Sequence, residues 1–234
     1  MNLLLLLCIP LITSLAILPV RSRAMVRWIS LFGSVAQLAA AVFLFFAYNQ
    51  ERDTGNTAVV LFEDHFKFIS NPEINFHFGV DGIAVAMILL TSFVLVAGVL
   101  VSWKIEKMTR EFYFLLLLLA LGAFGFFISL DLFVLFFFLE ISVIPKYLLI
   151  GIWGSGKKEY AANKLALMLM GGSALILVGI LLLYFNAGHT FDVLQLSHTN
   201  INGQLQKTVF PLLFIGFGVF TALFPFHTWV PDGH

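Results

Sequence analysis

Seven long apolar runs dominate this chain of 234 residues and leave few choices of fold. Each run has roughly the 20 mostly apolar residues that a helix needs to cross a bilayer. Backbone N–H and C=O groups in hydrocarbon must pair within the protein, so each run is predicted to be a helix. The runs, given to within a few residues, are 2–20, 28–48, 80–103, 112–129, 131–153, 161–185 and 208–224. The predicted fold class is an all-α polytopic membrane helix bundle, with residues 1–234 as a single transmembrane domain.

The composition supports a membrane protein and excludes several other classes. Charged residues make up 11% of the chain, whereas soluble domains carry about 25%. The net charge of zero gives no indication of a nucleic-acid partner. The single cysteine, Cys8, cannot form an internal disulfide, and the absence of a Cys and His cluster predicts no metal site. No Gly-rich phosphate loop follows a strand, so no nucleotide cofactor is predicted in this chain.

The basic residues predict how the chain is oriented in the membrane. The first run has no positive segment before it and no clear cleavage site, so it is predicted to be a retained helix rather than a signal peptide. Eight basic residues follow the first, third and fifth runs, and three lie in the other connections. By the positive-inside rule the richer side is cytoplasmic, which places the N-terminus and the loops 49–79 and 186–207 outside. The eight are Arg21, Arg23, Arg27, Lys104, Lys107, Arg110, Lys157 and Lys158, and the three are Arg52, Lys67 and Lys207.

Short elements of secondary structure are expected in the two long outer loops. Loop 49–79 contains two stretches with β character, 57–62 and 74–78, which favour a small hairpin on the membrane surface. Loop 186–207 contains 191–196, which predicts one amphipathic helical turn.

Glu140 is the most unusual residue within an apolar run. It lies about nine residues into the fifth run, or roughly 13 Å deep at 1.5 Å per residue. A charge near the bilayer centre costs at least about 2.5–3.5 kcal/mol, and intramembrane acids are functional by default. Glu140 is therefore predicted to be a proton-handling carboxylate. The alternative is a fixed ion pair that only holds two helices together.

Lys146 and Lys164 are further candidate relay groups. Lys146 follows Pro145, which removes a backbone donor and predicts a kink in the fifth helix. Lys146 is six positions after Glu140, about 240° around an ideal helix, so the two share a face only if the kink rotates them together. Snorkelling to the cytoplasmic interface is the competing interpretation for both lysines.

The last run is predicted to be a broken helix. Pro225 and Pro231 prevent a regular helix over its final residues. Broken helices at membrane depth expose backbone dipoles, as at the ion sites of transporters. His227 follows the break and titrates near physiological pH, so it is a candidate relay group, with hydrogen bonding to a freed carbonyl as the alternative.

Several motifs together resemble the antiporter-like membrane subunits of respiratory complex I, most of all their subunit M branch. The fifth run reads Glu140-x₄-Pro145-x-Tyr-Leu-Leu-Ile-Gly-Ile-Trp-Gly, which is similar to the fifth helix of that family. The segments 80–82 and 161–164 resemble the starts of its third and sixth helices, and 225–232 resembles its seventh-helix signature. The motifs run in the family's order from about residue 76 to the last residue, as in the N-terminal half of such a subunit.

The resemblance implies a proton-translocating subunit that couples quinone reduction to proton transport. It implies no cofactor in this chain, with NADH, FMN, iron–sulfur clusters and quinone held by other subunits. The partners it implies are the other membrane-arm subunits and the lipid bilayer, in a bacterial inner membrane. In the family a glutamate on helix five, matched by Glu140, pairs with a lysine on the broken helix seven.

One departure from the family keeps alternatives open. Phe220 stands five positions before Pro225, where the family places its lysine. Lys146 is then the possible substitute partner, and without one Glu140 stays protonated. The competing functions are a subunit of a multisubunit Na⁺/H⁺ antiporter or membrane-bound hydrogenase, and a non-pumping membrane scaffold.

Overall fold

The computed structural model describes residues 2–70 and 73–233, and the chain divides into two compact units. Unit 1 comprises Met1–His65 and Phe78–Ser129, and unit 2 comprises Phe66–His77 and Leu130–His234. Each unit is described by itself below, and the predicted single transmembrane domain stays a prediction.

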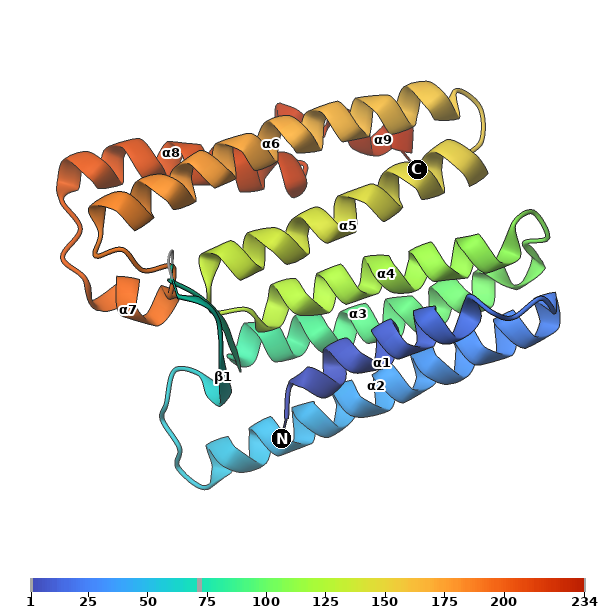
Figure 1. The fold of residues 1–234 in the computed structure, drawn as a ribbon, viewed down its shortest axis with the longest axis horizontal. Helices are drawn as coiled ribbons and strands as arrows, with labels where there is room; N and C mark the ends of the chain where they lie inside the picture. The colour runs from blue at the N-terminus through green and yellow to red at the C-terminus, as the bar shows by residue number, and fades with distance from the viewer. Residues whose placement is uncertain (1, 71–72, 234) are drawn as a thin grey trace. The chain divides into compact units, whose positions relative to one another are not determined.

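Unit 1 is a bundle of four helices, α1 to α4 (Figure 1). α2 packs against α1 and α3, and α4 packs against the same two helices. Their apolar side chains interdigitate around Leu6, Ile88 and Phe124, which have no exposed surface. The helix bounds are α1 (Leu4–Ile17), α2 (Arg23–Asp53), α3 (Gly82–Val101) with the short helix η1 (Ser102–Lys104), and α4 (Thr109–Ile128).

A β-hairpin confirms part of the prediction for loop 49–79. Strands β1 (Leu61–Ser70) and β2 (Glu73–Val80) form a two-stranded sheet. The second predicted strand lies within β2, but the first was placed too early. Residues before Leu61 are held in a loop because the Arg52 guanidinium donates to the carbonyl oxygens of Asn56 at 3.0 Å and Ala58 at 2.6 Å.

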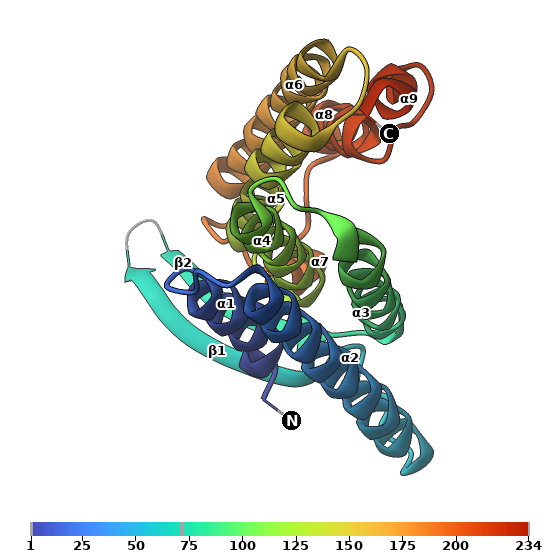
Figure 2. The ribbon, with the colours of Figure 1, turned by 90° about the vertical axis from the view of Figure 1, so that its right-hand side faces the viewer.

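Unit 2 is organised around the long helix α6, which packs against α5, α8 and α9. Figure 2 shows α8 and α9 beside α6, and both helices pack against it. The element bounds are α5 (Leu132–Trp153), α6 (Lys158–Asn186), α7 (Val193–His198), α8 (Gly203–Phe220), η2 (Phe226–Thr228) and α9 (Trp229–Gly233).

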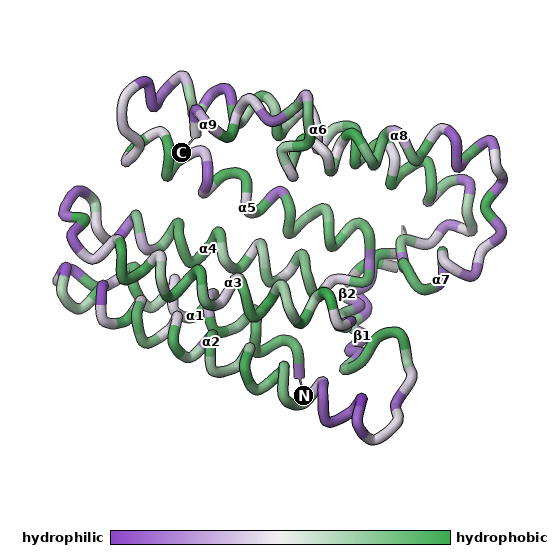
Figure 3. Tube along the Cα trace, turned by 180° about the vertical axis from the view of Figure 1, so that it is seen from behind, coloured by the Kyte–Doolittle hydropathy of each residue, from purple (hydrophilic) through white to green (hydrophobic). Residues whose placement is uncertain are grey.

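The all-α membrane fold is confirmed, but the count of seven spanning helices is not. All seven predicted runs coincide with helices, of which α2 to α6 are long and apolar enough to cross a membrane. These helices are mostly hydrophobic, and hydrophilic residues gather mainly near the connections between helices (Figure 3). α1 has 14 residues, about 21 Å of helix, which is less than the hydrocarbon thickness of about 30 Å. α8 has 18 residues, and its first turn carries Gln204, Gln206 and Lys207.

The predicted break in the last helix is confirmed, and a capping motif rather than proline begins it. α8 ends at Phe220. The N–H of Leu223 donates to the Gly218 oxygen at 2.8 Å and that of Ala222 to the Val219 oxygen at 3.3 Å. This pair of bonds is the Schellman pattern, with Ala222 in the left-handed region at φ 56°. The helix therefore stops before Pro225, which only prevents its resumption.

Glycines allow α6 and α8 to pack closely. A side chain on Gly172 of α6 would meet the Val219 Cβ at 2.9 Å, and one on Gly216 of α8 would meet the Gly172 oxygen at 2.8 Å. Small residues at helix contacts are the usual means of close packing in membranes, where water does not drive helices together.

We expect Gly172→Ala to destabilise unit 2 by about 1–3 kcal/mol, because the added methyl overpacks the contact with Val219. Gly171→Ala is the matched control, since a Cβ there meets nothing within 4 Å. Thermal unfolding in detergent measures both. Equal melting temperatures for the two variants would contradict close packing at Gly172.

A buried polar cluster of His77, Asp131 and Asp192 joins three segments of unit 2. Asp131 caps α5, because its Oδ1 accepts the N–H groups of Phe133 at 2.9 Å and Val134 at 3.0 Å. His77, which is 2% exposed, lies with its Nδ1 2.5 Å from the Asp192 carboxylate. Burial raises the pKa of the Asp131 carboxyl above its ordinary value, backbone N–H donors lower it in part, and Asp192 raises it further.

The raised pKa predicts a pH-dependent contribution of Asp131 to stability. A carboxyl whose pKa is higher in the folded state binds its proton more tightly there, so stability present at low pH is lost as pH rises through the folded pKa. Asp131→Asn keeps an oxygen acceptor and cannot ionise, so we expect this loss to be absent from its unfolding curves between pH 3 and 8. Asp131→Ala also removes the cap and should cost about 0.5–2 kcal/mol at every pH. Parallel pH profiles for the parent and Asp131→Asn would refute the assignment.

Candidate functional site

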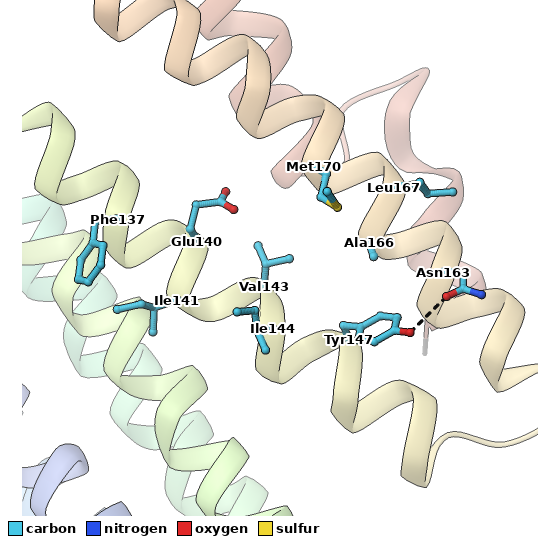
Figure 4. Close-up of a pocket in the computed structure, with 10 residues that line it drawn as sticks. All are labelled: Phe137, Glu140, Ile141, Val143, Ile144, Tyr147, Asn163, Ala166, Leu167 and Met170. Carbon is cyan, nitrogen blue, oxygen red and sulfur yellow. Dashed lines mark hydrogen bonds between the residues drawn. The ribbon is translucent and has the colours of Figure 1, made fainter.

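Glu140 lies in a groove between α5 and α6. The cavity has a volume of about 810 Å³ and is lined almost entirely by apolar side chains. Glu140, Val143, Ile144 and Tyr147 follow one another at helical spacing on the wall formed by α5, and Figure 4 shows the carboxyl group of Glu140 directed toward α6. The lining residues are Phe137, Glu140, Ile141, Val143, Ile144, Tyr147, Asn163, Ala166, Leu167 and Met170.

One oxygen of the Glu140 carboxyl group is buried without a hydrogen-bond partner among the described residues. An unsatisfied buried oxygen is costly, so the site favours a proton, a water molecule or a cation there. Pro145 has no N–H to donate to the Ile141 carbonyl one turn earlier, so that carbonyl lacks its usual helical donor. Ile141 also lines the groove. α5 nevertheless continues through Pro145 as one helix from Leu132 to Trp153.

Ser173 on α6 interacts with the Glu140 carboxyl group. Its hydroxyl also lies 3.1 Å from the Met170 carbonyl oxygen and donates to it. One hydroxyl proton serves one acceptor at a time, so Ser173 can turn between the backbone and the carboxylate. Ser173 is therefore the polar neighbour with which the Glu140 carboxyl group can form a hydrogen bond.

Lys146 does not partner Glu140. Within residues 2–70 and 73–233 its ammonium group makes no hydrogen bond or ion pair, although the side chain is half-buried. Its offset of six residues along a helix that continues through Pro145 keeps it on another face of α5. A Glu140–Lys146 pair is therefore not observed among the described residues.

Lys164 forms an ion pair that sequence reasoning did not find. Its Nζ lies 2.6 Å from Asp232 Oδ2, and 5.8 Å from the centre of the Tyr160 ring. Asp232 belongs to α9, which follows the break after α8 and packs against the N-terminal half of α6. Proximity in the sequence could not reveal this contact, because 68 residues separate the partners.

His227 and Phe220 lie on either side of the break. His227 is exposed in η2 and stacks on Phe224 with ring centres 5.6 Å apart. Phe220, at the position of the family's lysine, packs against an apolar cluster that includes Val143 and Trp229. The indole N–H of Trp229 donates to the Val219 oxygen at 3.0 Å and so pins the end of α8. The four predicted site residues are thus not gathered into one cluster by the described structure.

Tyr147 and Asn163 are polar groove residues that sequence reasoning passed over. The Tyr147 hydroxyl donates to Asn163 Oδ1 at 3.4 Å across the groove. The available signal was spacing, since Tyr147 is seven residues after Glu140 and Asn163 seven before Met170. Seven residues are close to two turns, which places each pair on one helix face.

Comparison with known proteins connects this geometry to a family. Residues 129–234 match the family described as NADH:quinone oxidoreductase/Mrp antiporter, transmembrane. The NAD(P)H-quinone oxidoreductase chain 4-3 of Nostoc sp. is 34% identical over 231 residues, which cover 97% of this chain and 40% of the relative. The chloroplast chain 4 of Angiopteris evecta is 34% identical over 220 residues, covering 92% of this chain and 43% of the relative.

Solved structures agree with the fold. Respiratory complex I from Thermus thermophilus with bound NADH contains a chain with a TM-score of 0.87 at 24% identity, covering 99% of this chain and 46% of that one. A chain of the membrane-bound sulfane sulfur reductase, an archaeal respiratory membrane complex, gives 0.82 at 26% identity, covering 99% and 47%. This chain thus spans less than half the length of the relatives it matches. Residues 129–234 thus carry the transmembrane domain of the NADH:quinone oxidoreductase/Mrp antiporter family, and nearly the whole chain is similar to chain 4 of the NAD(P)H-quinone oxidoreductases, which confirms the resemblance seen in its motifs.

Proposed function

We propose that this chain is part of a proton-translocating membrane subunit of an NAD(P)H:quinone oxidoreductase, with Glu140 as its titrating group. The observation that carries the proposal is the buried, unpartnered oxygen of Glu140 in the apolar groove between α5 and α6. An acid at this depth is expensive to retain unless it exchanges a proton or a cation. Similarity to chain 4 of plant and cyanobacterial oxidoreductases supplies the reaction to which that exchange is coupled.

The energy for transport comes from other subunits in this proposal. NADH, FMN, iron–sulfur clusters and quinone belong to those subunits, and this chain contributes proton-handling side chains alone. Its partners are neighbouring membrane-arm subunits and the surrounding lipid. The basic-rich ends at Arg21, Lys104 and Lys157 face the cytoplasm of a bacterial inner membrane, and the N-terminus faces outward.

Lys164 and Ser173 support Glu140 in distinct ways. Lys164, paired with Asp232, lies toward the end of α6 that begins on the basic-rich side. Ser173 interacts with the Glu140 carboxyl group and stabilises either protonation state by rotation of its hydroxyl. His227 and Lys146 stay lesser candidates, because within the described chain neither contacts Glu140.

A multisubunit Na⁺/H⁺ antiporter is the second candidate function. The matched family joins NADH:quinone oxidoreductases and Mrp antiporters, and Phe220 removes the lysine that the oxidoreductase mechanism uses. Purification of the native complex distinguishes the two, because only an oxidoreductase reduces quinone with NAD(P)H. An antiporter instead collapses a proton gradient when sodium is added.

We expect Glu140→Gln to abolish the part of proton uptake that depends on this subunit, because an amide cannot carry a proton between sites. The measurement is proton uptake per NAD(P)H oxidised in inside-out vesicles that contain the whole complex. Glu106→Gln, in the connection between η1 and α4, is the matched control and should pump like the parent.

A non-pumping scaffold gives a different result in the same vesicles. If the chain only holds neighbouring subunits together, Glu140→Gln and Glu106→Gln should leave the same proton uptake per NAD(P)H. Quinone reduction measured in parallel shows whether the complex has assembled, so a loss of both activities would point to assembly rather than to transport.

A further inference from the structure

The groove that holds Glu140 is continued toward the basic-rich end of α5 and α6 by a second cavity. This smaller cavity has a volume of about 320 Å³ and lies between the C-terminal turns of α5 and the first turns of α6. Its lining includes Gly151, Ile152 and Glu159, and Glu159 is exposed in the first turn of α6. Each cavity therefore has one carboxyl group, Glu140 in the larger and Glu159 in the smaller.

Tyr147 and Asn163 line both cavities and separate them. The Tyr147 hydroxyl reaches from α5 to Asn163 on α6, as the dashed line in Figure 4 shows. At 3.4 Å this hydrogen bond is longer than the usual range for an O–H donor, so it is weak. Neither side chain is buried, and Tyr147 is 37% exposed, which leaves the pair room to rotate apart.

The distance beyond the pair requires water. Tyr147 lies seven residues from Glu140 on the same helix face, about 10 Å along the axis. A proton cannot cross that distance between two side chains without bridging water molecules. The apolar walls around Val143, Ile144 and Leu167 hold water poorly. Because Tyr147 and Asn163 line both cavities, a file of water molecules from Glu159 to Glu140 has to pass their contact, which must then be open.

We propose that the Tyr147–Asn163 hydrogen bond is a gate between the basic-rich side of the membrane and the cavity of Glu140. Closed, it separates the two cavities. Open, it lets water and protons pass from Glu159 to Glu140 along the groove between α5 and α6. The gate deepens the proposed function, since it controls the supply of protons to Glu140. Access through it is nevertheless measurable without any proton transport.

Accessibility of an introduced thiol tests the gate. Ala166 lines the larger cavity beyond the pair, and Cys8 is the only cysteine in the chain. In a Cys8→Ser, Ala166→Cys background, a charged, membrane-impermeant methanethiosulfonate is added to the Lys157 side of vesicles that contain the whole complex. We expect Tyr147→Phe, which removes the hydroxyl and keeps the ring, to raise the labelling rate about twofold to threefold. This is the shift expected at the weak end of the range for one hydrogen bond. Asn163→Ala should give a similar rise.

Two controls separate gating from other effects. Tyr184→Phe makes the same chemical change at the far end of α6 and should leave the labelling rate at the parent value. Ala161→Cys places a thiol at a buried position of α6 that lines neither cavity, and it should stay unlabelled in the Tyr147→Phe chain.

Two results would overturn the gate. One is an unchanged labelling rate at Ala166→Cys in both Tyr147→Phe and Asn163→Ala. The other is a parallel rise at Ala161→Cys, which would mean that α6 has loosened as a whole. Because labelling does not depend on pumping, a gate that responds as expected in chains whose transport is indifferent to Glu140→Gln would refute the proposed function and leave the gate intact.

Discussion

A carboxyl group in an apolar groove between two membrane helices is the constraint on which the rest of this structure depends. A charge near the bilayer centre costs at least about 2.5–3.5 kcal/mol, and one Glu140 oxygen has no partner among the described residues. Neutral polar groups near the carboxyl group, rather than a positively charged side chain, reduce this cost. Ser173 offers a rotating hydroxyl, and Pro145 leaves the Ile141 carbonyl without its usual donor. Those groups suit a neutral, protonated carboxyl as well as an ionised one.

The replacement of the family's lysine by Phe220 changes the chemistry that α8 can offer. Phe220 packs against the cluster of Val143, Leu165, Leu169, Val219 and Trp229, so the region beside α5 is apolar. Lys146 does not take over, because α5 continues through Pro145 and keeps the two residues on different faces. Control of proton access therefore becomes the more plausible means of regulating Glu140 than the movement of an ion pair.

Much of the fold could be predicted because its signals are local. Apolar runs of about 20 residues in lipid must be helices, and Asp81 and Asp131 cap α3 and α5 as acidic residues before apolar runs commonly do. The start of β1 and the end of α8 were less predictable. Arg52 holds the chain before β1 in a loop through hydrogen bonds to Asn56 and Ala58, and a left-handed alanine, Ala222, ends α8 before the proline that seemed responsible.

The site was harder to predict because its contacts are distant in the sequence. Depth and chemistry alone were sufficient to single out Glu140. The Tyr147–Asn163 bond, however, depends on the register between α5 and α6, which residue spacing on one helix does not determine. Asp232 reaches Lys164 because the chain, after the break that ends α8, continues along α6 toward its N-terminal turns, where α9 packs. Residue type placed Lys164 near the interface, and tertiary structure assigned its partner.

That Lys164–Asp232 contact has an electrostatic consequence for the mouth of the groove. Lys164 adjoins Asn163 in the sequence, and it lies near the positive end of the α6 dipole, where an isolated ammonium group would add to a potential that already repels cations. Asp232, 2.6 Å away, turns the charge into a short dipole whose field fades quickly with distance. The pairing therefore removes one of the positive charges that would repel hydronium ions where the groove meets the aqueous phase.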